Sequence, residues 1–308
     1  MKTVFYMIES FFAVLIIVVF ILITVSAVTP QTTLSKADVP HTTLIIHALP
    51  VAFPGRIQKV TEEGTDWKII LDGDTFFWAD GRLLPEKDLT DINKYSRHPF
   101  YSYTRELRPI PQYTDEEKKG LNERIANRKN DPPKRNPAFH NALWRVYDKK
   151  SADETMKWIS FLNYTVQIHP GIESSLDSVE TEIRQKAEHN PELKKYISSF
   201  TRISGYTWRP IADTKSLSFH SYGVAIDIIP GDTGGKEQYW LWTARSNAEW
   251  FQVPYSRRYS PPAEFIEAFE HHGFIWGGKW FYFDTIHFEY RPEILIANGM
   301  RPEKILPQ

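Results

Sequence analysis

The chain has 308 residues, with 37 Lys and Arg residues against 38 Asp and Glu residues, and it contains no cysteine. A length of this order suits one large domain or two modest ones. The near-zero net charge provides no long-range attraction to nucleic acid or to an anionic membrane surface. The lack of cysteine excludes thiol nucleophiles, disulfides and Cys-ligated metals.

The N-terminus carries a targeting signal. Residues 11–28 read FFAVLIIVVFILITVSAV and contain no charge. A buried core helix is a poor interpretation, because the run is apolar on every side and lies at the chain terminus. We interpret residues 1–30 as a cleaved signal peptide or, because the run is long, preferably as an uncleaved signal-anchor. Both predict export to the cell envelope, with the rest of the chain in the periplasm or outside the cytoplasmic membrane.

The next segments differ sharply in composition. Residues 31–43 are polar and are interpreted as a tether. Residues 44–112 predict a small β-rich region, because short apolar or alternating runs at 51–60, 67–71 and 75–78 are separated by turn signals such as Asp72-Gly73. Residues 113–135 carry many charges of both signs, so a solvated helix and loop is expected rather than a binding patch.

Residues 113–308 predict an α+β domain. Pro261 and Pro262 suit the start of a helix, and Gly273 suits the left-handed position after its end. Strands and helices are segregated along the chain, which indicates α+β rather than a doubly wound sheet. The predicted helices cover residues 140–147, 151–162, 172–188 and 261–271, and the predicted strands cover residues 164–169, 200–209, 223–229 and 280–290.

The first cluster of chemical groups is Ser218-Phe-His-Ser-Tyr-Gly-Val-Ala-Ile-Asp227. An ionised carboxylate in an apolar strand is costly unless another group compensates it. If Ser221-Tyr-Gly223 forms a turn, His220 can fold back beside Asp227. The alternative is a structural Asp paired with an arginine or with backbone N–H groups, beside an ordinary core histidine.

The second cluster is Asp284-Thr-Ile-His-Phe-Glu-Tyr290. Strand alternation puts His287 and Glu289 on one face, where Glu289 either orients a ligand imidazole or simply faces solvent. Asp284 reaches the same site only if a turn or bulge lies between it and His287. An aromatic-rich core strand with a surface acid is the alternative. Together the clusters offer three N or O ligands and a spare carboxylate, the minimum for a catalytic zinc site.

The combination of Ser-x-His-x-x-Gly-x-Ala-x-Asp with carboxylate-x-x-His resembles the zinc D-Ala-D-Ala carboxypeptidase and L-Ala-D-Glu endopeptidase family. This family acts on peptidoglycan and shares its fold with the Hedgehog signalling domain. The resemblance covers residues 200–291. It implies one Zn²⁺ ion held by His220, Asp227 and His287, with Asp284 as the general base. Ser218 matches the serine that begins the family motif and is expected to contact substrate.

Two details refine the resemblance. Family members use an arginine upstream of the first motif to stabilise the oxyanion or to hold a substrate carboxylate. This role implies Arg209, with Arg202 as the competitor and a purely structural arginine as the alternative. Asp284 stands where vancomycin-resistance-type carboxypeptidases usually carry Glu, which resembles the branch of phage endolysins and cell-wall endopeptidases.

The resemblance implies zinc-dependent hydrolysis of D-Ala-D-Ala or L-Ala-D-Glu type bonds in peptidoglycan stem peptides. No Ser-x-x-Lys and no His-Glu-x-x-His occurs, which disfavours penicillin-binding serine enzymes and thermolysin-like zincins. One alternative is a catalytically inactive, membrane-tethered, Hedgehog-like binding module, although the well-spaced Asp284 favours an enzyme. A structural envelope protein is the other. A groove for a glycopeptide could be lined by Trp240, Trp242, Trp250, Trp276 and Trp280.

Overall fold

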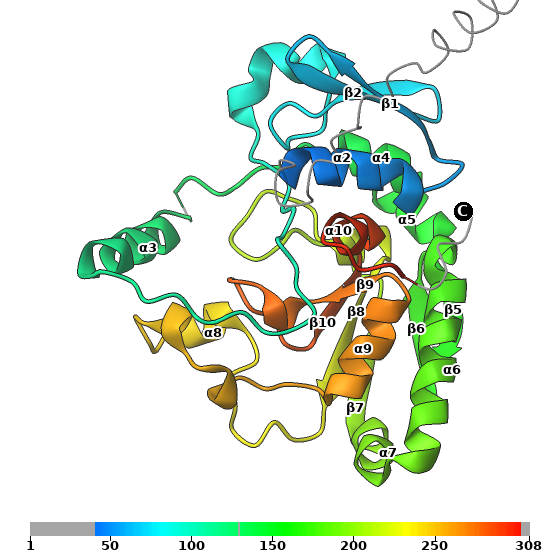
Figure 1. Cartoon of the computed structure of the whole chain (residues 1–308), viewed down its shortest axis with the longest axis vertical. Helices are drawn as coiled ribbons and strands as arrows, with labels where there is room; N and C mark the ends of the chain where they lie inside the picture. Colours follow the sequence, from blue (N-terminus) through cyan, green and yellow to red (C-terminus); the bar gives the residue numbers. More distant parts are fainter. Residues whose placement is uncertain (1–40, 129, 303–308) are drawn as a thin grey trace, which may run out of the picture. The chain divides into compact units, whose positions relative to one another are not determined.

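The structure, a computed structural model, describes residues 41–128 and 130–302. The predicted signal-anchor at 11–28 lies outside these residues. Within the part of the chain described, no helix combines the length and the apolar character needed to cross a lipid bilayer. Helices and three antiparallel sheets make up the described residues, in agreement with the predicted α+β class (Figure 1).

The N-terminal sheet is a meander that lies in the predicted β-rich region. Its strands pair in the order β1-β2-β3-β4. Gly64 and Gly73 occupy the first two turns with positive φ, which glycine adopts without steric cost. The strands are β1 (Ile57–Glu63), β2 (Asp66–Leu71), β3 (Asp74–Phe77) and β4 (Leu84–Pro85), and the 3₁₀ helix η1 (Glu86–Lys94) follows them.

A helix that the sequence analysis did not predict precedes this sheet. Helix α2 (His41–Ala52) includes the last three residues of the predicted tether and the start of the run at 51–60. Its buried residues are Ile45, Ile46, Ala48, Leu49 and Ala52. Their spacing is helical, but β-branched pairs such as Ile45-Ile46 favour strands. The segment forms a helix because it packs against α10 (Pro292–Ala297), which is far away in the sequence.

The middle of the chain holds short helices and a hairpin. Helix α3 (Asp115–Asn127) is solvated as predicted, and a capping box between Thr114 and Glu117 fixes its start. The helix predicted at 151–162 is wrong in its second half, because α5 ends at Thr155 and the chain continues as a strand. These elements are α4 (Ala138–Trp144), α5 (Lys149–Thr155), β5 (Lys157–Phe161), β6 (Tyr164–Ile168), η2 (Pro170–Ile172), α6 (Glu173–His189) and α7 (Pro191–Ser198).

The central sheet carries the functional groups. Its strands pair in the order β7-β8-β10-β9. Strands β7, β8 and β10 are shorter than the runs predicted from the sequence, and β9 was not predicted. The strands are β7 (Phe200–Ser204), β8 (Ala225–Pro230), β9 (Phe274–Trp276) and β10 (His287–Tyr290). The remaining elements are η3 (Phe219–Tyr222), α8 (Trp240–Ala244), η4 (Trp250–Gln252), η5 (Tyr255–Arg257), α9 (Ala263–His271) and η6 (Gly277–Lys279).

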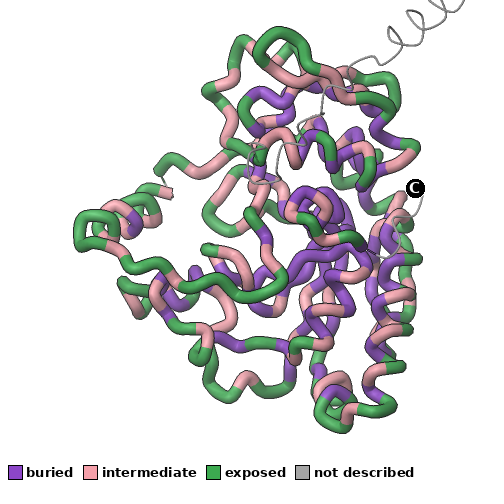
Figure 2. Tube along the Cα trace, in the orientation of Figure 1, coloured by how far each residue is buried: buried purple, intermediate pink, exposed green. Residues whose placement is uncertain are grey.

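The two faces of the central sheet have opposite characters. Phe288 on β10 stacks on Phe269 of α9 with ring centroids 4.1 Å apart, and Phe265 packs beside it. Burying each such ring stabilises the fold by about 1.5–3 kcal/mol. Buried residues accordingly concentrate around α9 and the central sheet (Figure 2). Since side chains alternate along a strand, the neighbours of Phe288 point away from α9.

Candidate metal centre and active site

Two of the predicted ligands are cross-strand neighbours. In the antiparallel pairing of β8 with β10, His287 lies opposite Asp227. Ile226, which precedes Asp227, and Phe288, which follows His287, are also paired across the strands, and both are fully buried in the core. Asp227 and His287 therefore point together to the face that α9 does not cover. The sequence predicts only that His287 and Glu289 share one face of their strand.

His220 reaches this face from a tight turn before β8. The Ser218 hydroxyl accepts the His220 backbone N–H at 3.3 Å and caps helix η3. Gly223 ends the helix with φ +66°, and a Cβ there would lie only 2.6 Å from the backbone nitrogen of His169. Any other residue at Gly223 would be strained and would clash, so the turn that returns His220 to Asp227 requires this glycine.

The three predicted ligands meet at one point. Asp227 Oδ1 lies 3.1 Å from His220 Nε2 and 2.9 Å from His287 Nδ1, and the two imidazole nitrogens are 3.2 Å apart. These three atoms are the sort of donors that bind transition-metal ions, and they all lie within 4.8 Å of one another.

The outer nitrogen of each imidazole is held by an acceptor. His220 Nδ1 lies 2.6 Å from the Gly205 carbonyl, and His287 Nε2 lies 3.2 Å from Glu289 Oε2. A proton on each outer nitrogen leaves the inner nitrogen free to donate its lone pair to a metal. Two imidazoles and one carboxylate, each with its donor atom turned inward, fit a zinc ion with open coordination.

Electrostatics favour a cation between these groups. Burial by itself would raise the pKa of Asp227. The charges and hydrogen bonds of His220 and His287 have a larger opposite effect, so the pKa of Asp227 lies below its usual range. Burial likewise disfavours the imidazolium of His287, but the hydrogen bonds to Asp227 and Glu289 raise its pKa to about 10. A metal ion and the second proton of His287 therefore compete for Nδ1.

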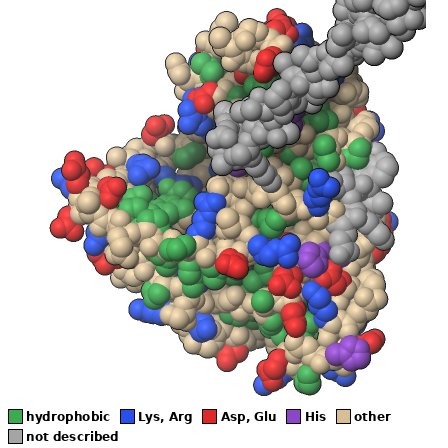
Figure 3. Space-filling view, viewed as in Figure 1, with side chains coloured by type: hydrophobic (Ala, Val, Ile, Leu, Met, Phe, Trp, Pro, Cys, Tyr) green, Lys and Arg blue, Asp and Glu red, His purple; other side chains and the backbone are tan. Residues whose placement is uncertain are grey.

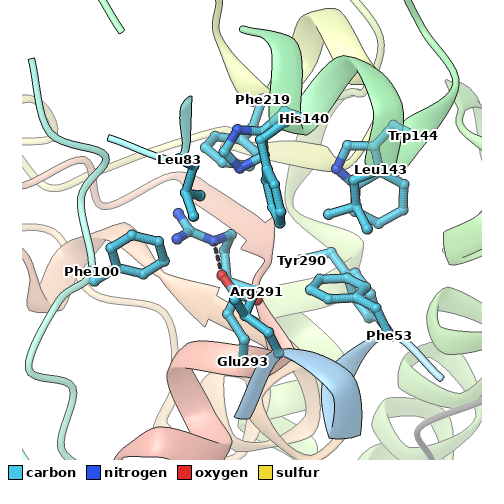
Figure 4. Close-up of a pocket in the computed structure, with 12 residues that line it drawn as sticks. Phe53, Leu83, Phe100, His140, Leu143, Trp144, Phe219, Tyr290, Arg291 and Glu293 are labelled. Atoms are coloured by element: carbon cyan, nitrogen blue, oxygen red, sulfur yellow. Dashed lines mark hydrogen bonds and ion pairs between the residues drawn. The ribbon is translucent and has the colours of Figure 1, made fainter. Parts of the chain in front are cut away.

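Glu289 belongs to a buried charge network. It is 5% exposed and accepts a hydrogen bond from Arg291 Nη1 at 3.2 Å, so it does not face solvent. Arg291 also bonds Glu293, and its Nη2 donates to the Pro99 carbonyl at 3.1 Å. Figure 4 shows the Arg291–Glu293 contact beside Phe100. The network thus joins the N-terminal part of the chain to the imidazole of His287.

Replacing Glu289 with Gln should weaken zinc binding about 10- to 100-fold, the usual effect of changing the partner of a ligating histidine. The substitution keeps the size of the side chain but removes the charge that makes His287 a better donor. Competition with a chromophoric chelator measures the affinity. Glu293→Gln is the matched control, since Glu293 bonds Arg291 and touches no predicted ligand. Equal losses in both variants would contradict the orienting role of Glu289.

Asp284 lies next to the three ligands. The His287 N–H donates to the Asp284 carbonyl at 3.3 Å, which closes the turn that the sequence analysis required between them. Burial raises the pKa of the Asp284 carboxyl to about 7, where the positive charge of His287 opposes the rise and Asp227 adds to it. Its Oδ1 is buried and has no hydrogen-bond partner within the described part of the chain. Such an acceptor is available for a proton or for a bound water.

These groups line a cavity of about 600 Å³. Ser218, Arg209 and Arg202 line it as well, and the last two have exposed side chains. Among the tryptophans considered for a groove, Trp240, Trp242 and Trp280 line the cavity, whereas Trp250 and Trp276 are buried outside it. On the face drawn in Figure 3, hydrophobic side chains gather between α3 and α8, beside Lys or Arg side chains.

The sequence analysis missed part of the cavity wall. Arg128 and Arg135 come from the charged segment 113–135, which was interpreted as solvated, yet both line the cavity. Tyr101 and Tyr239 also line it. The Pro132-Pro133 pair, which ends the charged run, is the one local signal that the chain changes direction there. Only the fold reveals where it goes.

Two family models match this chain. Residues 212–290 match the family described as D-alanyl-D-alanine carboxypeptidase, which confirms the resemblance seen in the motifs. This segment contains all three converging side chains and Asp284. Residues 46–100 match a domain of unknown function. Comparisons with curated proteins and with solved structures returned no match.

Proposed function

We propose that the protein is a zinc-dependent peptidase that hydrolyses D-Ala-D-Ala or L-Ala-D-Glu type bonds in peptidoglycan stem peptides. The observation that carries the proposal is the convergence of His220, Asp227 and His287 beside Asp284 in one cavity. The match of residues 212–290 supplies the substrate class. The uncharged run at 11–28 supports an exported, membrane-anchored location in the cell envelope.

The chemistry divides among the residues of the cavity. His220, Asp227 and His287 would hold a zinc ion, which supplies a Lewis acid that activates water and polarises a carbonyl. Asp284 accepts the proton of the attacking water at its unpaired Oδ1 and passes it to the leaving amine. Arg209, whose backbone bonds the Ser221 hydroxyl in the turn that carries His220, stabilises the oxyanion.

Ser218 has a positioning role in addition to any contact with substrate. Its hydroxyl already accepts the His220 N–H, and that bond sets the turn from which the imidazole enters the cavity. The hydroxyl hydrogen stays available for a peptide carbonyl, because a serine oxygen both accepts and donates. Ser218 therefore links substrate to the position of His220.

Digestion of purified peptidoglycan tests the proposed function directly. Zinc-loaded protein should release peptide fragments whose masses identify the bond cleaved. Chelation should abolish the release, and added zinc should restore it, since a single metal site is required. Metal content is measured on the same samples by elemental analysis.

The two alternatives predict different outcomes of this experiment. Protein that binds one zinc ion per chain and releases no fragment would be a binding module related to Hedgehog-type domains. Protein that neither binds zinc nor cleaves peptidoglycan would contradict the metal centre itself.

A further inference from the structure

The active-site cavity contains more positive charge than its own carboxylates neutralise. Four arginines line it, namely Arg128, Arg135, Arg202 and Arg209, against the three carboxylates Asp227, Asp284 and Glu289. Among the described residues, none of these arginines has a carboxylate oxygen within 4.0 Å. Asp227 and Glu289 are already bonded to the imidazole of His287. The cavity is therefore built to receive an anionic group.

Arg135 is the arginine whose situation is hardest to explain without a ligand. Its Nε is buried and has no hydrogen-bond partner among the described residues. Isolated buried charge is expensive, so buried arginines are normally paired with carboxylates. The Nε of Arg128 is also buried without a hydrogen-bond partner among the described residues, but its guanidinium lies over the rings of Trp240 and Tyr282 at 5.3 and 5.6 Å, which stabilises its cation.

The chain holds Arg135 in place through its backbone. The Arg135 N–H donates to the Ser216 hydroxyl at 2.9 Å, and this hydroxyl donates in turn to the Pro133 carbonyl at 3.0 Å. The Lys215 N–H donates to the same carbonyl at 2.9 Å. The backbone of the segment is therefore fixed against the loop before Ser218, so only the side chain of Arg135 has to be ordered when a ligand binds.

Arg135 and Arg202 lie toward different ends of the sheet face that holds the ligands. On β7, Arg202 pairs with Ile229, which is two residues beyond Asp227 on β8. The segment of Arg135 instead adjoins the Glu289 side, because the Lys134 carbonyl accepts the Ser96 N–H at 2.7 Å and the Asn136 carbonyl lies 3.1 Å from His98 Nε2, next to Pro99. The Pro99 carbonyl accepts from Arg291, which bonds Glu289, and Glu289 is paired with Ala225 at the opposite end of β8. A peptide bound across the metal ligands thus meets a separate cation on the Glu289 side.

We propose that Arg135 binds a free carboxylate of the substrate on the Glu289 side of the metal ligands, and so selects acidic stem peptides over their amidated forms. This inference rests on the proposed function, and it adds a specificity residue from outside the matched segment 212–290. A guanidinium binds carboxylate through paired, charge-assisted hydrogen bonds, whereas a carboxamide offers one acceptor and no charge. Stem peptides carry carboxylates on D-Glu, on a third-position diamino acid and at the C-terminus.

Synthetic stem pentapeptides that are amidated at one of these three positions test the proposal. For wild type, one of the three amidations should lower kcat/KM about 10- to 100-fold, the range for hydrogen bonds to charged groups. In Arg135→Gln this difference should shrink to about threefold or less. Arg135→Lys, which keeps the charge without the paired geometry, should retain an intermediate preference.

Arg202→Gln is the matched control, because it removes one positive charge from the same cavity. It should leave the preference that Arg135 creates intact, and every variant should hold as much zinc as wild type. The proposal is overturned if Arg135→Gln keeps the full preference, if Arg202→Gln abolishes that same preference, or if wild type tolerates all three amidations equally.

Binding of the same peptides to Asp284→Asn, measured by calorimetry, separates this proposal from the proposed function. Suppose that adding Arg135→Gln abolishes the preference for the free carboxylate while wild type hydrolyses no peptide. This result would refute the proposed peptidase activity and support the carboxylate-binding role of Arg135. Hydrolysis by wild type without a carboxylate preference in either kcat/KM or binding would support the peptidase activity and refute the role of Arg135.

Discussion

Replacing Asp284 with Asn is expected to lower the rate of stem-peptide hydrolysis about 10²- to 10⁴-fold, the usual contribution of a general base. The zinc content should stay at the wild-type level, because Asp284 is not among the three converging ligand groups. No other cavity carboxylate can replace it, since Asp227 and Glu289 are both bonded to His287. Mass spectrometry of digested peptidoglycan measures the rate, and elemental analysis measures the metal.

Two further variants make this result interpretable. Asp177→Asn removes an exposed acid from α6 and should leave hydrolysis unchanged. Asp284→Glu keeps a carboxylate at this position, and it should retain more activity than Asp284→Asn. An Asp284→Asn protein with full activity and normal zinc content would show that the base lies elsewhere.

Replacing Arg291 with Met should lower the free energy of unfolding by about 3–5 kcal/mol, the range for breaking a buried ion pair from one side. Arg291 is 2% exposed and bonds Glu289 and Glu293, which are themselves buried. The substitution leaves both carboxylates without their cation. Chemical denaturation monitored by tryptophan fluorescence measures the loss.

Arg184→Met is the control for this prediction. Arg184 forms an ion pair with Glu180 on the surface of α6, where its side chain is 44% exposed. Removing a surface ion pair costs about 0–1 kcal/mol. Similar losses in the two variants would mean that the buried network contributes no more than a surface pair. The Arg291→Met protein should also bind zinc more weakly, because Glu289 loses the group that holds it.

The motifs made the metal centre predictable from the sequence. Strand alternation placed His287 and Glu289 on one face, and the register of β8 with β10 sets His287 opposite Asp227. The turn before Asp227 depends on Gly223, and the turn after Asp284 is equally local. Interactions within a few residues, together with one strand pairing, are enough to assemble this part of the site.

The parts that escaped prediction depend on contacts between distant segments. Helix α2 contains β-branched residues that favour strands, and its packing on α10 overrides that preference. Arg135 lies in a charged stretch that is typical of a solvated surface, and bonds from its segment to the distant residues Lys215 and Ser216 bring it to the cavity. The bond from Arg291 to the Pro99 carbonyl spans 192 residues and leaves no pattern in the sequence.

The bond from Arg291 to the Pro99 carbonyl joins the two segments that match family models. Arg291 follows directly after the segment matched to the carboxypeptidase family, and Pro99 lies within the matched domain of unknown function. Loss of residues 46–100 would remove the acceptor of Arg291 Nη2, while Glu289 and Glu293 would still hold the rest of the guanidinium. A protein without residues 46–100 would therefore need another acceptor, or solvent, for this nitrogen of Arg291.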